Sequence, residues 1–260
     1  MRANHGPRAS RARLFCLLLI AHLAFARAED FPTAAARCKI SGSIQFQGDP
    51  PPRKALDWAG HSKVKEFYKG VPFLDERFVI DERGGVQHCL VYVSKGLEKF
   101  QFEPPKDAVV LDQLGYRFEP HVFGIMAGQK LTIRNLDEDA HNIHCICNEN
   151  AGFNIAQPNK DTLTQQKFAA AEAPFRIQCD LHIWMQAWCG VFEHPFFCVS
   201  AVDGAFELPG LPPGKYEITA WHERLGAQKV FVTLTAEKSK AIVFTYGDDA
   251  PAPHEIQPEK

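Results

Sequence analysis

Short runs of β-branched and aromatic residues, each ended by glycine, proline, asparagine or aspartate, recur along most of the chain. Such runs are typical of strands, and the residues between them are typical of tight turns. Residues 54–69 have scattered apolar positions that fit one short helix, and no other segment keeps a helical period. The pattern therefore predicts an all-β fold. We expect strands at residues 38–46, 86–93, 109–111, 121–125, 130–134, 175–178, 187–192, 196–201, 205–208, 214–222, 229–234 and 240–246.

The first 28 residues are expected to be a signal peptide and not part of this fold. They begin with several arginines, continue with an apolar run at 14–25, and end in Ala26-Arg27-Ala28, which places small residues where a signal peptidase reads them. We predict cleavage near Ala28 and a periplasmic or secreted location. The alternative is a disordered or membrane-anchoring N-terminus. No later segment has about 18 consecutive apolar residues, so the sequence predicts no membrane span.

The chain that follows is acidic and contains an odd number of cysteines. Removal of residues 1–28 takes away five arginines and no acid, so 24 basic residues face 31 acidic ones, a net charge of −7 with neutral histidine. Binding to nucleic acid requires clustered cations and is not expected. In an oxidising compartment disulfides are expected, and setting one cysteine aside as a metal ligand leaves six that can pair. The seven are Cys38, Cys89, Cys145, Cys147, Cys179, Cys189 and Cys198.

Residues 203–216, DGAFELPGLPPGKY, are expected to form a strand, a tight turn and a second strand. Gly204 and Gly214 can supply positive φ, and Pro212-Pro213 presets the bend. The segment resembles the signature of carboxypeptidase-regulatory-like, transthyretin-like β-sandwiches, whose usual opening strand is matched by ISGSI at 40–44.

We therefore predict two β-sandwiches, one inserted in or joined to the other. The transthyretin-like sandwich is expected to be built from two separate parts of the chain, and the segment between them has its own site chemistry. The expected divisions are the signal peptide 1–28, a first part at 29–105, a central domain at 106–200, a second part at 201–247 and a disordered tail at 248–260.

Residues 175–185, FRIQCDLHIWM, carry a predicted strand into the pattern C-x-x-H-x-x-M. A thiolate at a strand end, an imidazole three residues later and a thioether three further on can surround one small ion. A second imidazole is available after the predicted strand 130–134 and an acidic turn. Two imidazoles and a thiolate in a plane, with a weak axial thioether, suit electron-transfer copper. We predict a mononuclear copper site formed by His141, Cys179, His182 and Met185.

The alternative interpretation is that Cys179 forms a disulfide and Met185 packs in the core. Other short motifs accompany the ligand loop: Leu111-Asp112-Gln113, Pro120-His121-Val122, His141-Asn142-Ile143-His144, Phe153-Asn154, Gln157-Pro158, His194-Pro195-Phe196 and Trp221-His222-Glu223.

With these motifs, residues 128–191 resemble plastocyanin and amicyanin, and the ligand loop has the shorter amicyanin-type length. The chain after residue 28 resembles exported bacterial proteins of the plastocyanin-like or methylamine-utilisation type. This resemblance implies a cupredoxin-like Greek-key sandwich in which His141 and His182 are imidazole ligands, Cys179 is the thiolate and Met185 is axial. It also implies that Asn142 ties the two ligand segments together. Tyr116 stands where many relatives have cysteine, which leaves the disulfide pairing open.

A second cluster of metal-binding residue types follows His141. His144, Cys145 and Cys147 complete a His-x-x-His-Cys-x-Cys pattern that can form a zinc or copper(I) site. A loop disulfide, or pairing with Cys189 or Cys198, is the more ordinary interpretation.

Four further residues have no clear metal partner in the sequence. We expect His121 and His222 to have a packing role, and Trp184 and Trp188 to shield the site and fill the core.

The leading functional prediction is an exported one-electron carrier or electron-transfer domain that binds copper and is not an enzyme. It would require a redox partner protein, whose identity the sequence does not give, and the oligomeric state stays open too. One alternative is copper storage or delivery, which would use the histidines and cysteines near His141. Another is a structural module with a vestigial metal site. An oxidase is disfavoured because the sequence contains one complete ligand set.

Overall fold

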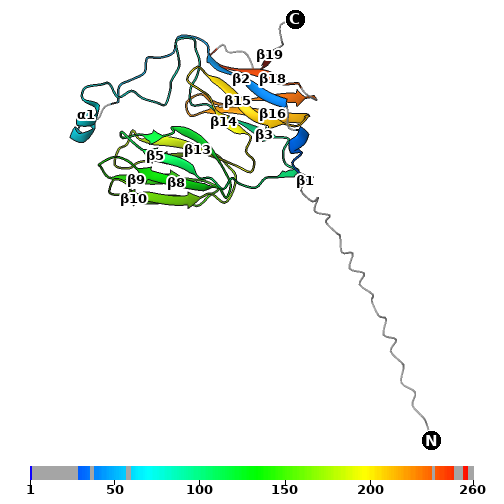
Figure 1. Ribbon diagram of the computed structural model, residues 1–260, viewed down its shortest axis with the longest axis horizontal. Coiled ribbons are helices and arrows are strands. Elements are labelled where there is room, and N and C mark those ends of the chain that lie inside the picture. Colours follow the sequence, from blue (N-terminus) through cyan, green and yellow to red (C-terminus); the bar gives the residue numbers. More distant parts are fainter. Residues whose placement is uncertain (2–28, 36–37, 57–59, 236–237, 249–253, 257–260) are drawn as a thin grey trace.

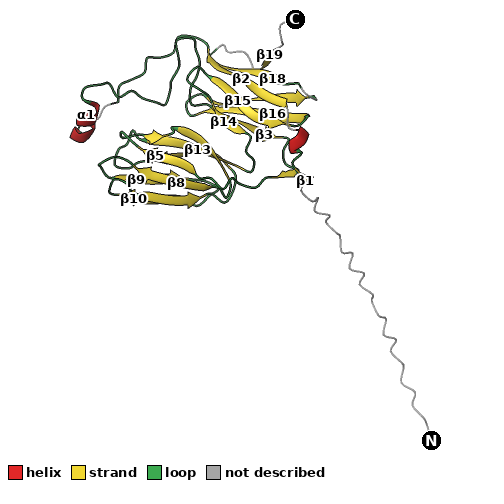
Figure 2. Cartoon of the chain, in the orientation of Figure 1, coloured by secondary structure: helices red, strands yellow, loops and turns green. Residues whose placement is uncertain are grey.

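The computed structural model describes residue 1 and residues 29–35, 38–56, 60–235, 238–248 and 254–256. The predicted signal peptide, from residue 2 onward, lies outside the described residues. The described chain is nearly all β, as predicted (Figures 1 and 2). Within it, no helix is long and apolar enough to cross a membrane.

The middle of the chain folds into two sheets that share one core, which we call the central sandwich. Its core lies between the sheets and includes Leu111, Ile133, Ile143 and Ile177, all fully buried. One sheet has the order β10 (Phe153–Gln157), β9 (His141–Ile146), β12 (Glu172–Gln178), β13 (Gln186–Phe192) and β7 (Val122–Met126). The other has the order β11 (Leu163–Lys167), β8 (Lys130–Asn135), β5 (Val109–Gln113) and β6 (Phe118–Glu119).

Segments before and after the central sandwich combine into a second pair of sheets, the flanking sandwich. Ile44, Val91, Ile218 and Phe244 belong to its core. One sheet has the order β14 (Phe197–Val199), β3 (Leu90–Lys95), β16 (Gly214–His222) and β17 (Gly226–Leu234). The other has the order β15 (Ala205–Leu211), β2 (Cys38–Phe46), β18 (Lys240–Tyr246) and β19 (His254–Ile256).

Strand pairing therefore joins a segment that precedes the central sandwich to segments that follow it. In the described residues β2 pairs with β15 and with β18, and both of these partner strands belong to the flanking sandwich. β14 pairs with β3, so residues 197–199 already lie in a flanking sheet although the expected boundary followed residue 200. The predicted domain limits, and the assignment of the flanking sandwich to a transthyretin-like family, stay predictions.

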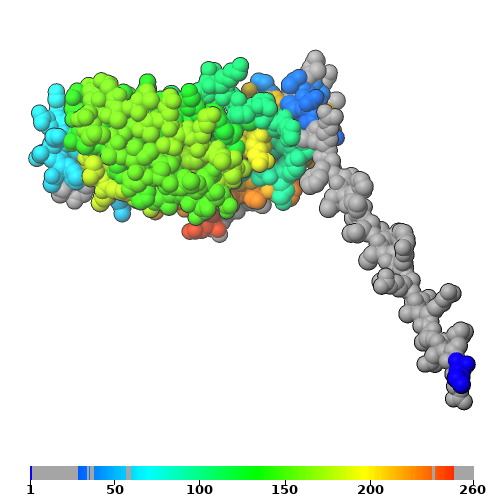
Figure 3. All heavy atoms as spheres, turned by 90° about the horizontal axis from the view of Figure 1, so that it is seen from below, coloured from blue at the N-terminus to red at the C-terminus, as the bar shows by residue number. Residues whose placement is uncertain are grey.

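A long excursion from the flanking sandwich carries the short helix α1 (Ser62–Tyr68) to one end of the central sandwich (Figures 1 and 3). Val64 is buried in the central core, and the Tyr68 hydroxyl donates to the carbonyl oxygen of Gly115 at 2.7 Å. Two short elements near the N-terminus, β1 (Glu29–Asp30) and the 3-10 helix η1 (Thr33–Ala35), complete the fold with β4 (Phe100–Gln101), which pairs with β1.

Three expectations from the sequence differ from this fold. β9, β10 and β11 were not predicted as strands, and neither were the two-residue strands β1, β4 and β6. Part of the tail expected to be disordered forms β19, which pairs with β18 and covers its open edge. Gly204 has the expected positive φ of 78°, but Gly214 does not, and a Cβ there would lie 2.9 Å from the Tyr216 hydroxyl.

Candidate metal centre

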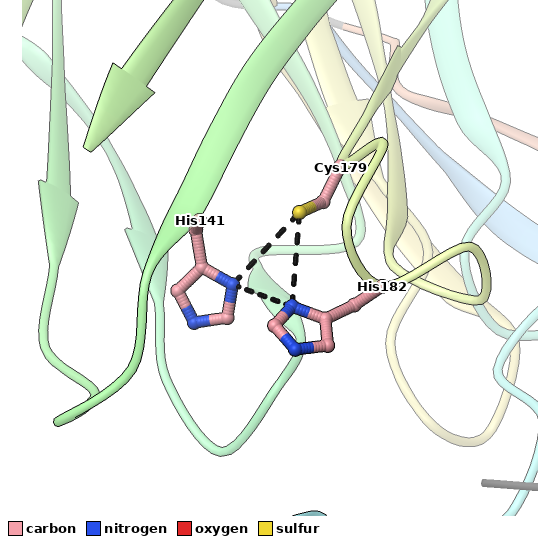
Figure 4. Close-up of side chains that lie close together, drawn as sticks. All are labelled: His141, Cys179 and His182. Carbon is pink, nitrogen blue, oxygen red and sulfur yellow. Dashed lines mark hydrogen bonds between the residues drawn. The ribbon is translucent and has the colours of Figure 1, made fainter. Parts of the chain in front are cut away.

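Three of the four predicted ligands come together at one end of the central sandwich (Figure 4). His141 begins β9, Cys179 directly follows β12, and His182 lies in the loop that leads to β13. The Cys179 Sγ lies 3.9 Å from His141 Nδ1 and 3.8 Å from His182 Nδ1, and the two Nδ1 atoms are 3.1 Å apart. All three residues are buried, and no other such group of histidine, cysteine or acidic residues occurs in the described part of the chain.

These distances fit a small ion bound in the plane of the three atoms. Metal bonds of about 2.0 Å to nitrogen and 2.3 Å to sulfur, spread evenly in a plane, separate two nitrogens by about 3.5 Å and nitrogen from sulfur by about 3.8 Å. The observed separations differ from these by a few tenths of an ångström. Two imidazoles and one thiolate are also the donors that suit copper in a trigonal site. The residues present therefore fit a bound copper ion.

The fourth predicted ligand, Met185, closes the loop that contains Cys179 and His182. The Cys179 amide donates to the Met185 carbonyl at 3.1 Å, and the Met185 amide donates to the His182 carbonyl at 2.8 Å. Met185 is 1% exposed and belongs to the same buried cluster as Cys179. The backbone thus holds Met185 beside the two other loop residues, away from water.

Asn142 ties the ligand loop to β9, as the resemblance implied. Its Oδ1 accepts the amide hydrogen of Asp180 at 2.7 Å and lies 3.3 Å from the Cys179 Sγ. The Asp180 carboxylate in turn accepts hydrogen bonds from the Asn142 and Gln178 side chains at 2.9 and 2.8 Å. The bond from Gln178, followed by one from His144, lowers the pKa of Asp180.

A buried carboxylate behind His141 was missed by the sequence analysis. The His141 Nε2 donates to Asp137 Oδ2 at 3.0 Å, and the same carboxylate accepts the amides of Gly115 and Tyr116 at 2.7 and 2.8 Å. A carboxylate in this position fixes the ring so that Nδ1 faces the other ligands. Asp137 belongs to an acidic turn with Glu138 and Asp139, and nothing in the sequence distinguishes it from them.

The electrostatics favour a charged pair in the absence of metal. Burial alone would lower the pKa of His141, but its hydrogen bonds with Asp137 and Cys179 raise it to about 9. Burial alone would raise the pKa of Cys179, but its hydrogen bonds with His141 and His182 lower it to about 6. The thiolate is the form that binds metal, so the protein stabilises the ligand state of Cys179, whereas His141 must release its Nδ1 proton to bind an ion.

Aromatic rings surround the two imidazoles. Tyr116 packs against the ring of His182 with centroids 5.1 Å apart, and Trp184 packs on the same ring at 5.5 Å. His61, just before α1, contacts Trp184 at 4.8 Å. Ile183, the residue after His182 in the ligand loop, is 87% exposed.

The second predicted cluster does not form a single site. His144 points away from the core and lies 3.0 Å from Asp180, whereas Cys145 is buried with its Sγ 3.3 Å from that of Cys147. Alternate residues of a strand face opposite sides, which separates His144 from Cys145.

The expected disulfides are absent among the described cysteines, all seven of which are free thiols. The buried cysteines are divided between two cores. Cys38 and Cys89 lie in the flanking core, whereas Cys145 and Cys189 lie in the central one.

Comparison with known proteins found similarity in structure and not in sequence. No protein-family model matches this chain, and no curated protein matches it. A copper-containing nitrite reductase from Thermus scotoductus SA-01 is 19% identical over 40% of this chain and 25% of its own length, with a TM-score of 0.32. A variant of amicyanin with Cu(I) is 20% identical over 33% of this chain and 82% of its own, with a TM-score of 0.29.

A purple cupredoxin from Nitrosopumilus maritimus is 22% identical over 33% of this chain and 100% of its own, also with a TM-score of 0.29. This chain spans about a quarter of the nitrite reductase's length. The likeness to these three proteins extends over 33 to 40% of this chain.

Proposed function

We propose that this chain is an exported copper protein whose central sandwich carries one electron at a time. The observation that supports this most strongly is the buried convergence of His141, Cys179 and His182, with ligand atoms 3.1 to 3.9 Å apart. In this proposal Met185 is the axial ligand. Bound copper would supply a one-electron couple.

The surrounding residues suit a carrier because they hold the ligands still. Asp137 orients His141, Asn142 fixes the ligand loop, and the aromatic rings exclude water. Ligands held in one arrangement require little reorganisation when the charge of the ion changes. The cavity beside Met185 has a volume of about 10 Å³, enough for about one water molecule. A space that holds about one water molecule suits a carrier better than an enzyme.

The test is metal analysis and a visible spectrum of the chain from residue 29 onward. One copper per chain and an intense visible band from sulfur-to-copper charge transfer are expected. A Met185→Leu variant should keep both and have a higher reduction potential, because it loses the weak axial ligand that stabilises copper(II).

Two other outcomes favour other functions. More than one copper(I) per chain would favour storage or delivery, for which the closely spaced Cys145 and Cys147 thiols are the relevant feature. Absence of tight copper binding would favour a structural module and would contradict the proposal.

A further inference from the structure

The two sandwiches meet through a buried contact close to the candidate metal centre. Val122 and Phe192 of the central sandwich are buried with Leu90 of the flanking sandwich. Beside them the rings of Trp188 and Trp221 pack with centroids 5.0 Å apart. Trp188 lies on β13, the strand that begins directly after Met185. The flanking sandwich therefore packs against the strand that leaves the ligand loop.

A closed ring of hydrogen bonds lies at this contact. Glu223, one residue past the end of β16, places Oε1 2.5 Å from His121 Nε2 and accepts the Gln186 side-chain amide on Oε2 at 2.9 Å. The other ring nitrogen of His121, Nδ1, lies 3.1 Å from the backbone carbonyl of Gln186. The side chains of His121 and Glu223 are 3% and 5% exposed. Both ends of Gln186 are thus held by groups shielded from water.

The geometry makes this ring stiff. His121 Nδ1 faces a carbonyl oxygen and Nε2 faces a carboxylate, so both ring nitrogens lie against hydrogen-bond acceptors. Hydrogen bonds with a charged partner are stronger than neutral ones. If one buried partner is removed, the other is left without compensation, which is costly. Displacement of Gln186 would break two of the three bonds at once.

We infer that Glu223 is a positioning residue through which the flanking sandwich fixes Gln186, and with it the adjacent Met185, at the metal centre. The inference rests on the proposed copper site. Met185 is bonded covalently to Gln186, and its carbonyl accepts the amide of Cys179. Outer groups that orient a ligand tune the metal it binds, so loss of Glu223 changes the axial interaction although Glu223 does not touch the site.

The test compares Glu223→Ala with a matched variant, Glu217→Ala. Glu217 is also a buried acid of the flanking sandwich, but it bonds Ser94, Lys95 and Lys229, all in that same sandwich. Both variants should lower the denaturation midpoint. Only Glu223→Ala should raise the reduction potential and shift the visible band. Glu223→Gln, whose oxygen can still accept from the Gln186 side chain while its amide donates to His121 Nε2, should restore much of the wild-type potential.

A double variant identifies the route of the effect. If Glu223 acts through Met185, adding Glu223→Ala to Met185→Leu should leave the potential of the single Met185→Leu variant unchanged. An equal shift in both backgrounds would overturn the inference, as would a Glu223→Ala potential identical to that of Glu217→Ala.

The copper-free protein provides an independent measurement. The methyl resonance of Met185 should move in Glu223→Ala and stay in place in Glu217→Ala, and an unmoved resonance would overturn the inference. If the wild type binds no copper, the proposed function fails, and the methyl resonance still tests the contact.

Discussion

Cys179 and Cys145 lie in the same buried cluster, with exposures of 1% and 2%, yet their surroundings give them opposite chemistry. Burial would raise the pKa of Cys179, but hydrogen bonds with two imidazoles lower it to about 6. Burial raises the pKa of Cys145 far above its ordinary value, and the neighbouring Cys147 thiol adds to the effect. In this comparison the thiol with burial alone is inert, and the thiol that also has hydrogen bonds with imidazoles becomes a ligand.

Strand β9 separates the two histidines of the His-x-x-His-Cys-x-Cys pattern. His141 is buried at the start of β9 and faces Cys179, whereas the side chain of His144 is 37% exposed and pairs with Asp180. A strand directs alternate side chains to opposite faces, so no single ion can bind both His144 and Cys145 without rearrangement of β9. The segment therefore contributes His141 to one site and leaves its cysteines in the core.

The largest expected effect is that of Cys179→Ser. The substitution replaces a soft thiolate with a hydroxyl that stays protonated, so copper binding should weaken strongly and the visible charge-transfer band should vanish. Copper stoichiometry and the absorption spectrum measure this. If Cys179→Ser kept both its copper and the visible band, Cys179 would not be the copper ligand.

Titration of the copper-free protein sharpens the same comparison. Cys179 should form a thiolate near pH 6 instead of near its ordinary pKa of 9.0, about a thousandfold difference in the equilibrium. The ultraviolet thiolate absorption of wild type minus Cys179→Ser isolates this step. The other thiols with shifted pKa values are raised and should not contribute. A difference spectrum that develops only above pH 8 would contradict the assignment.

The same pKa shifts predict how stability depends on pH. The folded pKa of Cys179 is depressed, so its contribution is complete above about pH 9 and is lost as the pH falls through about 6. The folded pKa of His141 is raised, so its contribution is complete below about pH 6.5 and is lost as the pH rises through about 9. In denaturant unfolding of the copper-free protein, the stability advantage of wild type over Cys179→Ser should therefore shrink on acidification through pH 6.

Asp137→Asn should have a smaller effect than loss of the thiolate. Asparagine can still accept the hydrogen bond from His141 Nε2, but it carries no charge. The pKa of His141 should therefore fall, and copper affinity should drop about 10- to 100-fold. Asp139→Asn is the matched control, because Asp139 is in the same turn but bonds Lys63, the Ala140 amide and the Tyr116 hydroxyl, and no ligand ring. Equal losses of copper affinity in both variants would mean that general charge at the turn, and not the contact with His141, is responsible.

The sequence predicted the strands whose apolar residues alternate strongly and whose ends carry turn residues. The limits of β2, β16 and β18 agree with the prediction to the residue. β10 and β11 were missed because each lies at the edge of its sheet and is polar on its outer face. β9 was missed because its sequence, HNIHCI, is dominated by site residues.

For the candidate site, too, some residues were predicted from the sequence and others were not. The loop spacing was sufficient to bring Cys179 and His182 together, because three residues of a tight loop leave little freedom. Asp137 was not singled out, and Glu223 was named only as part of the Trp221-His222-Glu223 motif, since each acts through a contact set by folding. Glu223 meets Gln186 across 37 residues and between two sandwiches. The motif named the residue, but it did not say which residue of the other sandwich it contacts.

The smallest effect on the metal centre is expected for Cys145→Ser and Cys147→Ser. Both residues lie in the central core but face each other and not the imidazoles, so the copper stoichiometry and the visible band should be unchanged. Cys145→Ser buries a hydroxyl among apolar side chains and should cost about 1–3 kcal/mol of unfolding free energy. Cys147 is half-buried, so its variant should cost less.

Denaturant unfolding, recorded beside the spectrum, separates these two results. A variant that loses stability but keeps its copper places Cys145 in the core, as its raised pKa indicates. Loss of copper in either variant would assign the metal to the cluster on β9. Because that cluster has two thiols 3.3 Å apart and no buried imidazole between them, it would favour transfer of copper(I) over electron transfer.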